Sequence, residues 1–269
     1  MTAESAGLDL ELLQALWPWI ALLTGLVTGS FANVCIHRIP LKQSVVSPRS
    51  RCPRCGAPIG ALENIPVLSY LALRGRCRAC RAPISPRYPL VEATNGALYF
   101  GLARVLGPTP AAAAAMVFVT ALLVLSLIDY DHHLLPNVIT LPGIAFGLLA
   151  SLLPGPPTPL EAAAASAAGY LALFAVAKTY EKTRGIEGLG QGDWKMAAML
   201  GAFLGWQKLL LTVFAATLAG TVVGLGLMAF RGRDSRHALP LGTFLGLAGI
   251  AVVFVGQAVI DWYGGLLRG

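Results

Sequence analysis

The chain of 269 residues is 56% hydrophobic and only 12% charged, with a net charge of +7 and a mean hydropathy of +0.68. A soluble domain carries roughly 25% charged residues, so this composition excludes an ordinary soluble protein. The apolar stretches are rich in Ala and Leu and lack the period-2 alternation of a membrane barrel. The expected fold class is therefore an all-α polytopic membrane protein.

Eight apolar segments are predicted to be transmembrane helices, and Pro and Gly separate them, as at Gly107-Pro108. Residues 1–14 contain acids but no Lys or Arg, so they do not resemble a cleavable signal peptide. We therefore expect the first span to remain in the mature protein. The predicted spans, of which the fourth and sixth are short, are 15–36, 89–106, 111–128, 138–153, 160–180, 193–206, 209–230 and 240–262.

The basic residues are distributed unevenly over the predicted loops. With the N-terminus in the periplasm, 16 of the 20 Lys and Arg residues lie in cytoplasmic loops. The positive-inside rule favours this orientation. A basic surface is also compatible with nucleic-acid binding, but setting topology and contacting anionic lipid headgroups explains the charge without it. The cytoplasmic loops are then 37–88, 129–137, 178–192 and 231–239.

Four of the five cysteines form two CxxC pairs, Cys52/Cys55 and Cys77/Cys80, separated by 21 residues. This spacing is typical of a zinc ribbon, and four thiolates leave no position for a catalytic water, so the zinc is expected to be structural. Disulfides are an alternative that a reducing cytoplasm disfavours. A redox pair is a second alternative, but it needs a thioredoxin-like strand and helix, which this segment lacks. The predicted division is a first span at 1–36, a cytoplasmic cysteine-rich domain at 37–88 and a membrane domain at 89–269.

Two aspartates are the candidate catalytic residues, because each lies where an apolar segment meets a polar loop. Asp129 ends the third span and Asp193 begins the sixth, so both are expected at the cytoplasmic face. Asp193 can also be read as a simple helix N-cap, with Gly190 and Gly192 allowing the loop to turn. These glycines also permit the backbone of a substrate to approach closely, which makes them candidate active-site loop residues.

Asp131 is the competing candidate for the first aspartate. Leu127 and Ile128 directly precede Asp129, which places it nearer the hydrocarbon and makes it the better choice. His132 and His133 follow, but two adjacent histidines in a loop more often face water than bind a metal. Two carboxylates brought close together can activate water for amide hydrolysis.

At these motifs the chain resembles the type IV prepilin peptidases, the bifunctional leader peptidase and N-methyltransferase family of bacterial inner membranes. The resemblance runs nearly end to end, and one departure is Asn137, where the family often has Asp. The matching motifs are Gly29-Ser30-Phe31-Ala32-Asn33-Val34, His37-Arg38-Ile39-Pro40, the CxxC pairs, Glu63-Asn64-Ile65-Pro66, Arg87-Tyr88-Pro89-Leu90-Val91-Glu92, Ile128-Asp129-Tyr130-Asp131 and Gly190-Gln191-Gly192-Asp193.

The resemblance implies an intramembrane aspartic endopeptidase with Asp129 and Asp193 as its catalytic pair. It further implies cleavage of type IV prepilins and type II secretion pseudopilins after a glycine at the cytoplasmic face. The new N-terminus would then be methylated from S-adenosylmethionine, although no segment resembles a Rossmann methyltransferase.

Two other classes of function are alternatives. A transporter or proton channel would place its acids near the bilayer midplane and show repeated halves, which this sequence lacks. A membrane-tethered zinc-ribbon binding module would leave the two aspartates unexplained.

Overall fold

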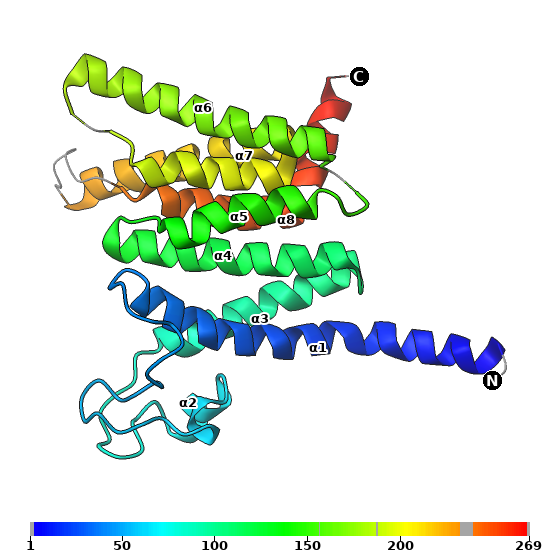
Figure 1. Ribbon diagram of the computed structural model, residues 1–269, viewed down its shortest axis with the longest axis vertical. Helices are drawn as coiled ribbons and strands as arrows, with labels where there is room; N and C mark the ends of the chain where they lie inside the picture. Colours follow the sequence, from blue (N-terminus) through cyan, green and yellow to red (C-terminus); the bar gives the residue numbers. More distant parts are fainter. Residues whose placement is uncertain (1–2, 156, 187, 232–238, 268–269) are drawn as a thin grey trace. The chain divides into compact units, whose positions relative to one another are not determined.

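The computed structural model describes residues 3–155, 157–186, 188–231 and 239–267, and its regular structure within them is helical apart from two isolated β-bridges (Figure 1). This confirms the all-α class. The helices are α1 (Ala3–Arg38), the 3-10 turn η1 (Leu62–Asn64), α2 (Leu68–Ala72), α3 (Arg87–Leu106), α4 (Pro110–His132), α5 (Asn137–Ala150), α6 (Pro159–Arg184), α7 (Gln191–Arg231) and α8 (Leu241–Leu266).

The predicted spans coincide with helices, but not every helix is long and apolar enough to cross a bilayer. By length and composition, five described helices qualify: α1, α4, α6, α7 and α8. This confirms a multi-pass membrane protein. The crossings predicted for α3 and α5, and the separate crossings predicted for the two halves of α7, stay predictions. Most of the loop expected at 231–239 lies outside the described residues.

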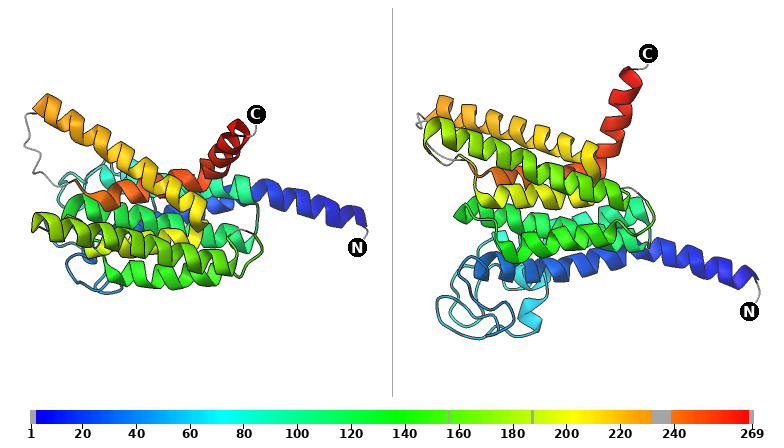
Figure 2. Two further views of the ribbon diagram at one scale, coloured as in Figure 1. Left: turned by 90° about the horizontal axis from the view of Figure 1, so that it is seen from above. Right: turned by 45° about the horizontal axis from the view of Figure 1, so that its top comes forward.

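The boundary predicted between the sixth and seventh spans corresponds to a break inside α7 at Gly205. This residue has φ 72° and ψ 177°, a conformation that L side chains rarely adopt. A Cβ at this position would also lie 2.8 Å from the Glu161 carboxylate. Figure 2 shows the chain reversing direction there. The first half of α7, Gln191–Leu204, is about 21 Å long, shorter than a hydrocarbon core of about 30 Å.

The chain divides into two compact units, Met1–Thr120 and Ala121–Gly269. In the first unit, glycines allow α1 and α3 to pack closely. A Cβ at Gly25 would lie 2.8 Å from the Cα of Gly96, and a Cβ at Gly29 would lie 2.8 Å from the Cα of Glu92. Small residues that let backbones approach are the usual way in which membrane helices associate.

A buried asparagine connects three helices of the first unit. Asn95 in α3 is fully buried, and its amide nitrogen donates to the Gly25 carbonyl and to Thr28 Oγ1, both at 2.8 Å. Its amide oxygen accepts from Thr120 Oγ1 of α4 at 2.9 Å. A polar group in an apolar interior is stable only when it has such partners. Asn95 therefore links α1, α3 and the part of α4 that belongs to this unit, residues 110–120.

Replacing Asn95 by Leu is expected to destabilise the protein by about 1–3 kcal/mol, because the Gly25 carbonyl and Thr28 hydroxyl lose a buried donor. Thermal unfolding of the purified protein in detergent measures this effect. Thr217→Ala is the matched control, since the exposed Thr217 hydroxyl donates only within its own helix. Equal unfolding temperatures for Asn95→Leu and the control would contradict a stabilising role of this network.

The first half of α7 is the centre of the second unit. Met196, Met199 and Leu200 are fully buried. On one side Gly201 and Gly169 allow α7 and α6 to approach, because a Cβ on either would meet backbone atoms of the other helix. On another side Gly143 and Gly147 of α5 leave room for α7 side chains. Close packing on several sides holds the start of α7, and with it Asp193, in a rigid setting.

Candidate active site and metal centre

Asp129 lies one turn before the C-terminal end of α4 and is only 6% exposed. Ile128 beside it is fully buried, whereas Asp131 and the two histidines that follow are exposed. The apolar residues near the end of α4 therefore hold the Asp129 carboxylate inside the second unit, whereas Asp131 is exposed.

The partner of Asp129 is the first turn of α8, which comes from more than a hundred residues further along the chain. Asp129 Oδ2 accepts from the backbone N–H of Thr243 at 2.7 Å and lies 3.2 Å from its hydroxyl. The N-cap residue of α8 is Pro240, which supplies no side-chain cap. A helix N-terminus has unpaired N–H groups and favours a negative charge, so Asp129 serves as a capping group supplied by another helix.

Asp193 lies in the first turn of α7 and is 8% exposed. Its Oδ2 accepts from the Gly190 N–H at 3.0 Å, while its own N–H donates to the Gly190 carbonyl at 3.1 Å. This reciprocal pair has the form of a capping box in which Gly190 is the N-cap and Asp193 is the third helical residue. The reading of Asp193 as the N-cap itself is therefore corrected: the N-cap is Gly190, three residues earlier. Gly190 supplies the cap without a side chain.

The two buried aspartates lie beside the same residue of the second unit, Leu135, in the loop between α4 and α5. A Cβ at Gly192 would lie 2.5 Å from Leu135 Cβ, and a Cβ at Gly242 would lie 2.7 Å from its Cδ1 and 2.9 Å from Asp129 Oδ2. The helix starts beside each aspartate are thus glycine because Leu135 occupies the space of a side chain.

Two contributors to this site carry no clear sequence signal. Thr243 and Gly242 look like an ordinary helix start, and their contact with Asp129 is not local in sequence.

Lys195 Nζ donates to Asn137 Oδ1 at 2.8 Å and ties the start of α7 to the start of α5. Position 137 is Asn here, where the family often has Asp, so Lys195 has a neutral partner instead of an acidic one.

The four cysteines form a cluster whose sulfur atoms all lie within 4.8 Å of one another. Zn–S bonds of about 2.3 Å in a tetrahedron place sulfurs about 3.8 Å apart, and the sulfurs of Cys52 and Cys80 are 3.9 Å apart. The two turns match: Cys52 N donates to Ala57 O and Cys77 N to Ala82 O, at 2.9 and 2.8 Å. These residues fit a zinc ion with four thiolate ligands.

Hydrogen bonds within the turns favour thiolates. The backbone N–H groups of Cys55 and then Arg54 lower the pKa of the Cys52 thiol to about 6. The Ala57 N–H lowers the pKa of Cys55, but the neighbouring Cys80 and Cys52 thiols, with burial, outweigh it and raise that pKa to about 11. Repulsion among the sulfurs thus opposes full deprotonation, and a divalent cation would offset it.

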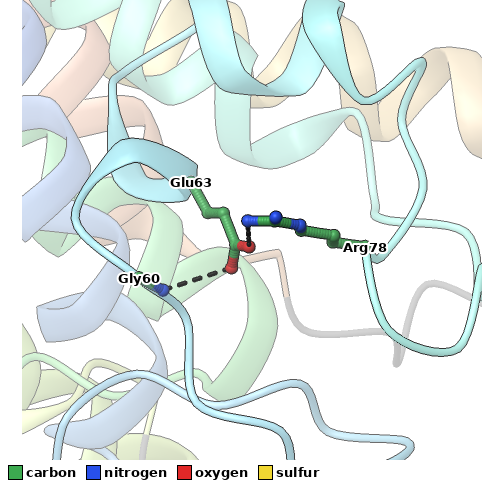
Figure 3. A network of polar contacts seen from close by, with 3 residues as sticks. All are labelled: Gly60, Glu63 and Arg78. Carbon is green, nitrogen blue, oxygen red and sulfur yellow. Dashed lines mark hydrogen bonds and ion pairs between the residues drawn. The ribbon is translucent and has the colours of Figure 1, made fainter.

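An ion pair connects η1 to the second cysteine turn (Figure 3). Glu63 Oε1 accepts from Arg78 at 3.1 Å, and Oε2 accepts from the Gly60 N–H at 3.1 Å. The Gly60 N–H, and after it Arg78, lower the pKa of Glu63. Because the Arg78 side chain is 76% exposed, the pair orients the loop more than it stabilises it. Cys35 in α1 is half-buried and lies outside the cluster.

Two hollows beside α6, of about 360 and 430 Å³, are lined mainly by Ala, Thr and aliphatic side chains, with one acid, Glu161, in the first. Trp206 also lines the first hollow and Tyr180 the second. No residues are assigned to a methyl donor.

Comparison with known protein families divides the chain into two matched regions. The bacterial peptidase A24 N-terminal domain matches residues 23–105, which include the four cysteines. The type IV leader peptidase family matches residues 116–225, which include Asp129 and Asp193. The two matched regions thus define one class, the membrane-embedded aspartic peptidases of this family.

Curated relatives extend the match over the whole chain. Prepilin leader peptidase/N-methyltransferases are 39% identical in Aeromonas hydrophila (96% of this chain, 98% of the relative) and 42% identical in Burkholderia pseudomallei (91% and 87%). That of Pseudomonas aeruginosa is 38% identical (90% and 91%). The chain belongs to the type IV leader peptidase family and is an aspartic peptidase of its bifunctional, methyltransferase-containing kind. No solved structure matches the chain.

Proposed function

We propose that the protein cleaves the leader peptides of type IV prepilins and type II secretion pseudopilins and then methylates the new N-terminus. The observation that carries the peptidase part is that Asp129, near the end of α4, and Asp193, at the start of α7, are both buried beside Leu135. Each aspartate has its Oδ2 atom held by a neighbouring N–H group. The Oδ1 atoms have no hydrogen-bond partner among the described residues and can therefore face a water molecule.

In the proposed reaction one carboxylate takes a proton from water, and the water oxygen attacks the scissile carbonyl carbon. The other carboxyl is protonated and gives its proton to the carbonyl oxygen. When the tetrahedral intermediate collapses, the C–N bond breaks and the nitrogen takes the proton held by the first carboxyl. One hydroxyl of the intermediate returns a proton to the second carboxylate, which restores the starting state.

The proposed orientation has the N-terminus in the periplasm and the aspartates at the cytoplasmic face of the inner membrane. The positive-inside distribution supports it. The apolar helix of the substrate would lie in the bilayer against the membrane helices, and its polar leader would stay in the cytoplasm. The 37–88 region would form a cytoplasmic domain around a structural zinc held by Cys52, Cys55, Cys77 and Cys80, with its arginines near lipid headgroups.

Incubating the purified protein with a synthetic prepilin N-terminal peptide and S-adenosylmethionine, followed by mass spectrometry, tests the proposal. We expect cleavage after the leader glycine and a gain of one methyl group on the new N-terminus. An intact peptide with well-folded protein would contradict the peptidase function.

Peptidase and methyltransferase activities are expected to separate, because the aspartates have no evident part in methyl transfer. An Asp193→Asn variant given an already cleaved peptide should methylate it at a rate within about twofold of wild type. The measurement is transfer of labelled methyl from S-adenosylmethionine. Loss of methylation in a variant that elutes and unfolds like wild type would argue for one shared site.

A further inference from the structure

The hydrogen bonds around the two aspartates are unequal. Asp129 Oδ2 has both the backbone N–H and the hydroxyl of Thr243 within hydrogen-bond distance. Asp193 Oδ2 has the single N–H of Gly190. Donors to a carboxylate stabilise its charged form, and bonds to a charged acceptor are about twice as strong as neutral ones. These hydrogen bonds therefore favour the charge on Asp129 over the charge on Asp193.

The Thr243 hydroxyl can also change its hydrogen-bond partner when the charge on Asp129 changes. It carries one proton and lies 3.2 Å from Asp129 Oδ2 and 3.0 Å from the carbonyl oxygen of Ser126. When Asp129 is ionised, the charge-assisted bond to Oδ2 is the stronger choice. When Asp129 holds a proton, the hydroxyl can turn to Ser126 and accept from the carboxyl.

Resting on the proposed function, we infer that Asp129 is the ionised member of the pair that activates water, that Asp193 carries the shared proton, and that Thr243 is the positioning residue that sets this assignment. Thr243 holds Oδ2 and so leaves Oδ1 for the water. It acts only through Asp129, since its own hydroxyl is directed at Oδ2 or at the Ser126 carbonyl.

The test is steady-state cleavage of a synthetic prepilin N-terminal peptide by Thr243→Val, which keeps the backbone N–H and removes the hydroxyl. We expect kcat to fall about 10- to 100-fold, the loss typical of one hydrogen bond to a charged group, with KM within about twofold of wild type. Thr243→Ser should restore kcat to within about threefold of wild type. If Asp129 instead carried the proton, removing a donor would favour that state, and kcat would stay the same or rise.

Thr212→Val is the matched control, because Thr212 is a fully buried threonine whose hydroxyl donates only to the Lys208 carbonyl of its own helix. It should keep wild-type kcat. Rates are divided by the monodisperse, folded fraction, and Thr243→Ala replaces the Val variant if that variant folds poorly. Unchanged kcat in the Val or Ala variant, or an equal loss in Thr243→Ser, would overturn the inference. Failure of the proposed function would differ, since wild-type protein would then leave the peptide intact.

Discussion

Replacing Asp129 or Asp193 by Asn is expected to abolish leader-peptide cleavage, with kcat falling by at least about 10²- to 10⁴-fold. Asn has the shape of Asp but cannot exchange a proton, so water activation and carbonyl protonation stop. The fold should persist, because the Asn amide oxygen can still accept from Thr243 N–H at position 129 or from Gly190 N–H at position 193. The measurement is cleavage of a prepilin peptide by each purified variant.

Because the two carboxyl groups act in one step, the double variant should be little worse than either single variant. Asp131→Asn is the matched control: it removes an acid two residues from Asp129 that the structure leaves exposed, and it should cost less than about fivefold. Near-normal turnover by Asp193→Asn would exclude the aspartic mechanism. Equal losses in Asp129→Asn and Asp131→Asn would leave the first member of the pair unassigned.

The helices and the two sites differ in how far their sequences predict them. Long apolar runs predict the helices because burying backbone polar groups in hydrocarbon leaves few other structures. The two candidate sites can be predicted because aspartates are rare beside apolar segments and two CxxC pairs are rare in one short loop region. The sequence predicts the break in α7 as the end of a span, and Gly205 is the residue whose backbone conformation permits it.

What the sequence does not predict is the set of contacts between distant helices. Thr243 lies 114 residues from Asp129 and has no pattern of its own, so only the packing of α8 against α4 brings them together. The sequence permits Asp193 at the N-cap, but Asp193 is the third helical residue, because the helix begins at Gln191 and Gly190 serves as the cap. Propensity alone does not separate an aspartate at the N-cap from one at the third helical position.

Replacing Cys52 or Cys77 by Ser is expected to reduce bound zinc from about one ion per chain to well under half. Each change removes one thiolate from a closed four-thiolate site, and Ser is a poor ligand for zinc. The region around the cysteines has no buried helix of its own: η1 and α2 contain no buried residues. Its order should therefore depend on the metal, and limited proteolysis should cut the variants within 37–88 at least about tenfold faster.

Elemental analysis of the purified protein measures the metal, and Cys35→Ala is the matched control because it removes a thiol outside the cluster. That variant should keep both its zinc and its resistance to protease. Because the aspartates lie in the other compact unit, a zinc-free Cys52→Ser protein should retain a helical membrane part with wild-type unfolding of that unit. Wild-type protein that contains no stoichiometric metal yet resists protease within 37–88 would show that the chain alone holds the region together.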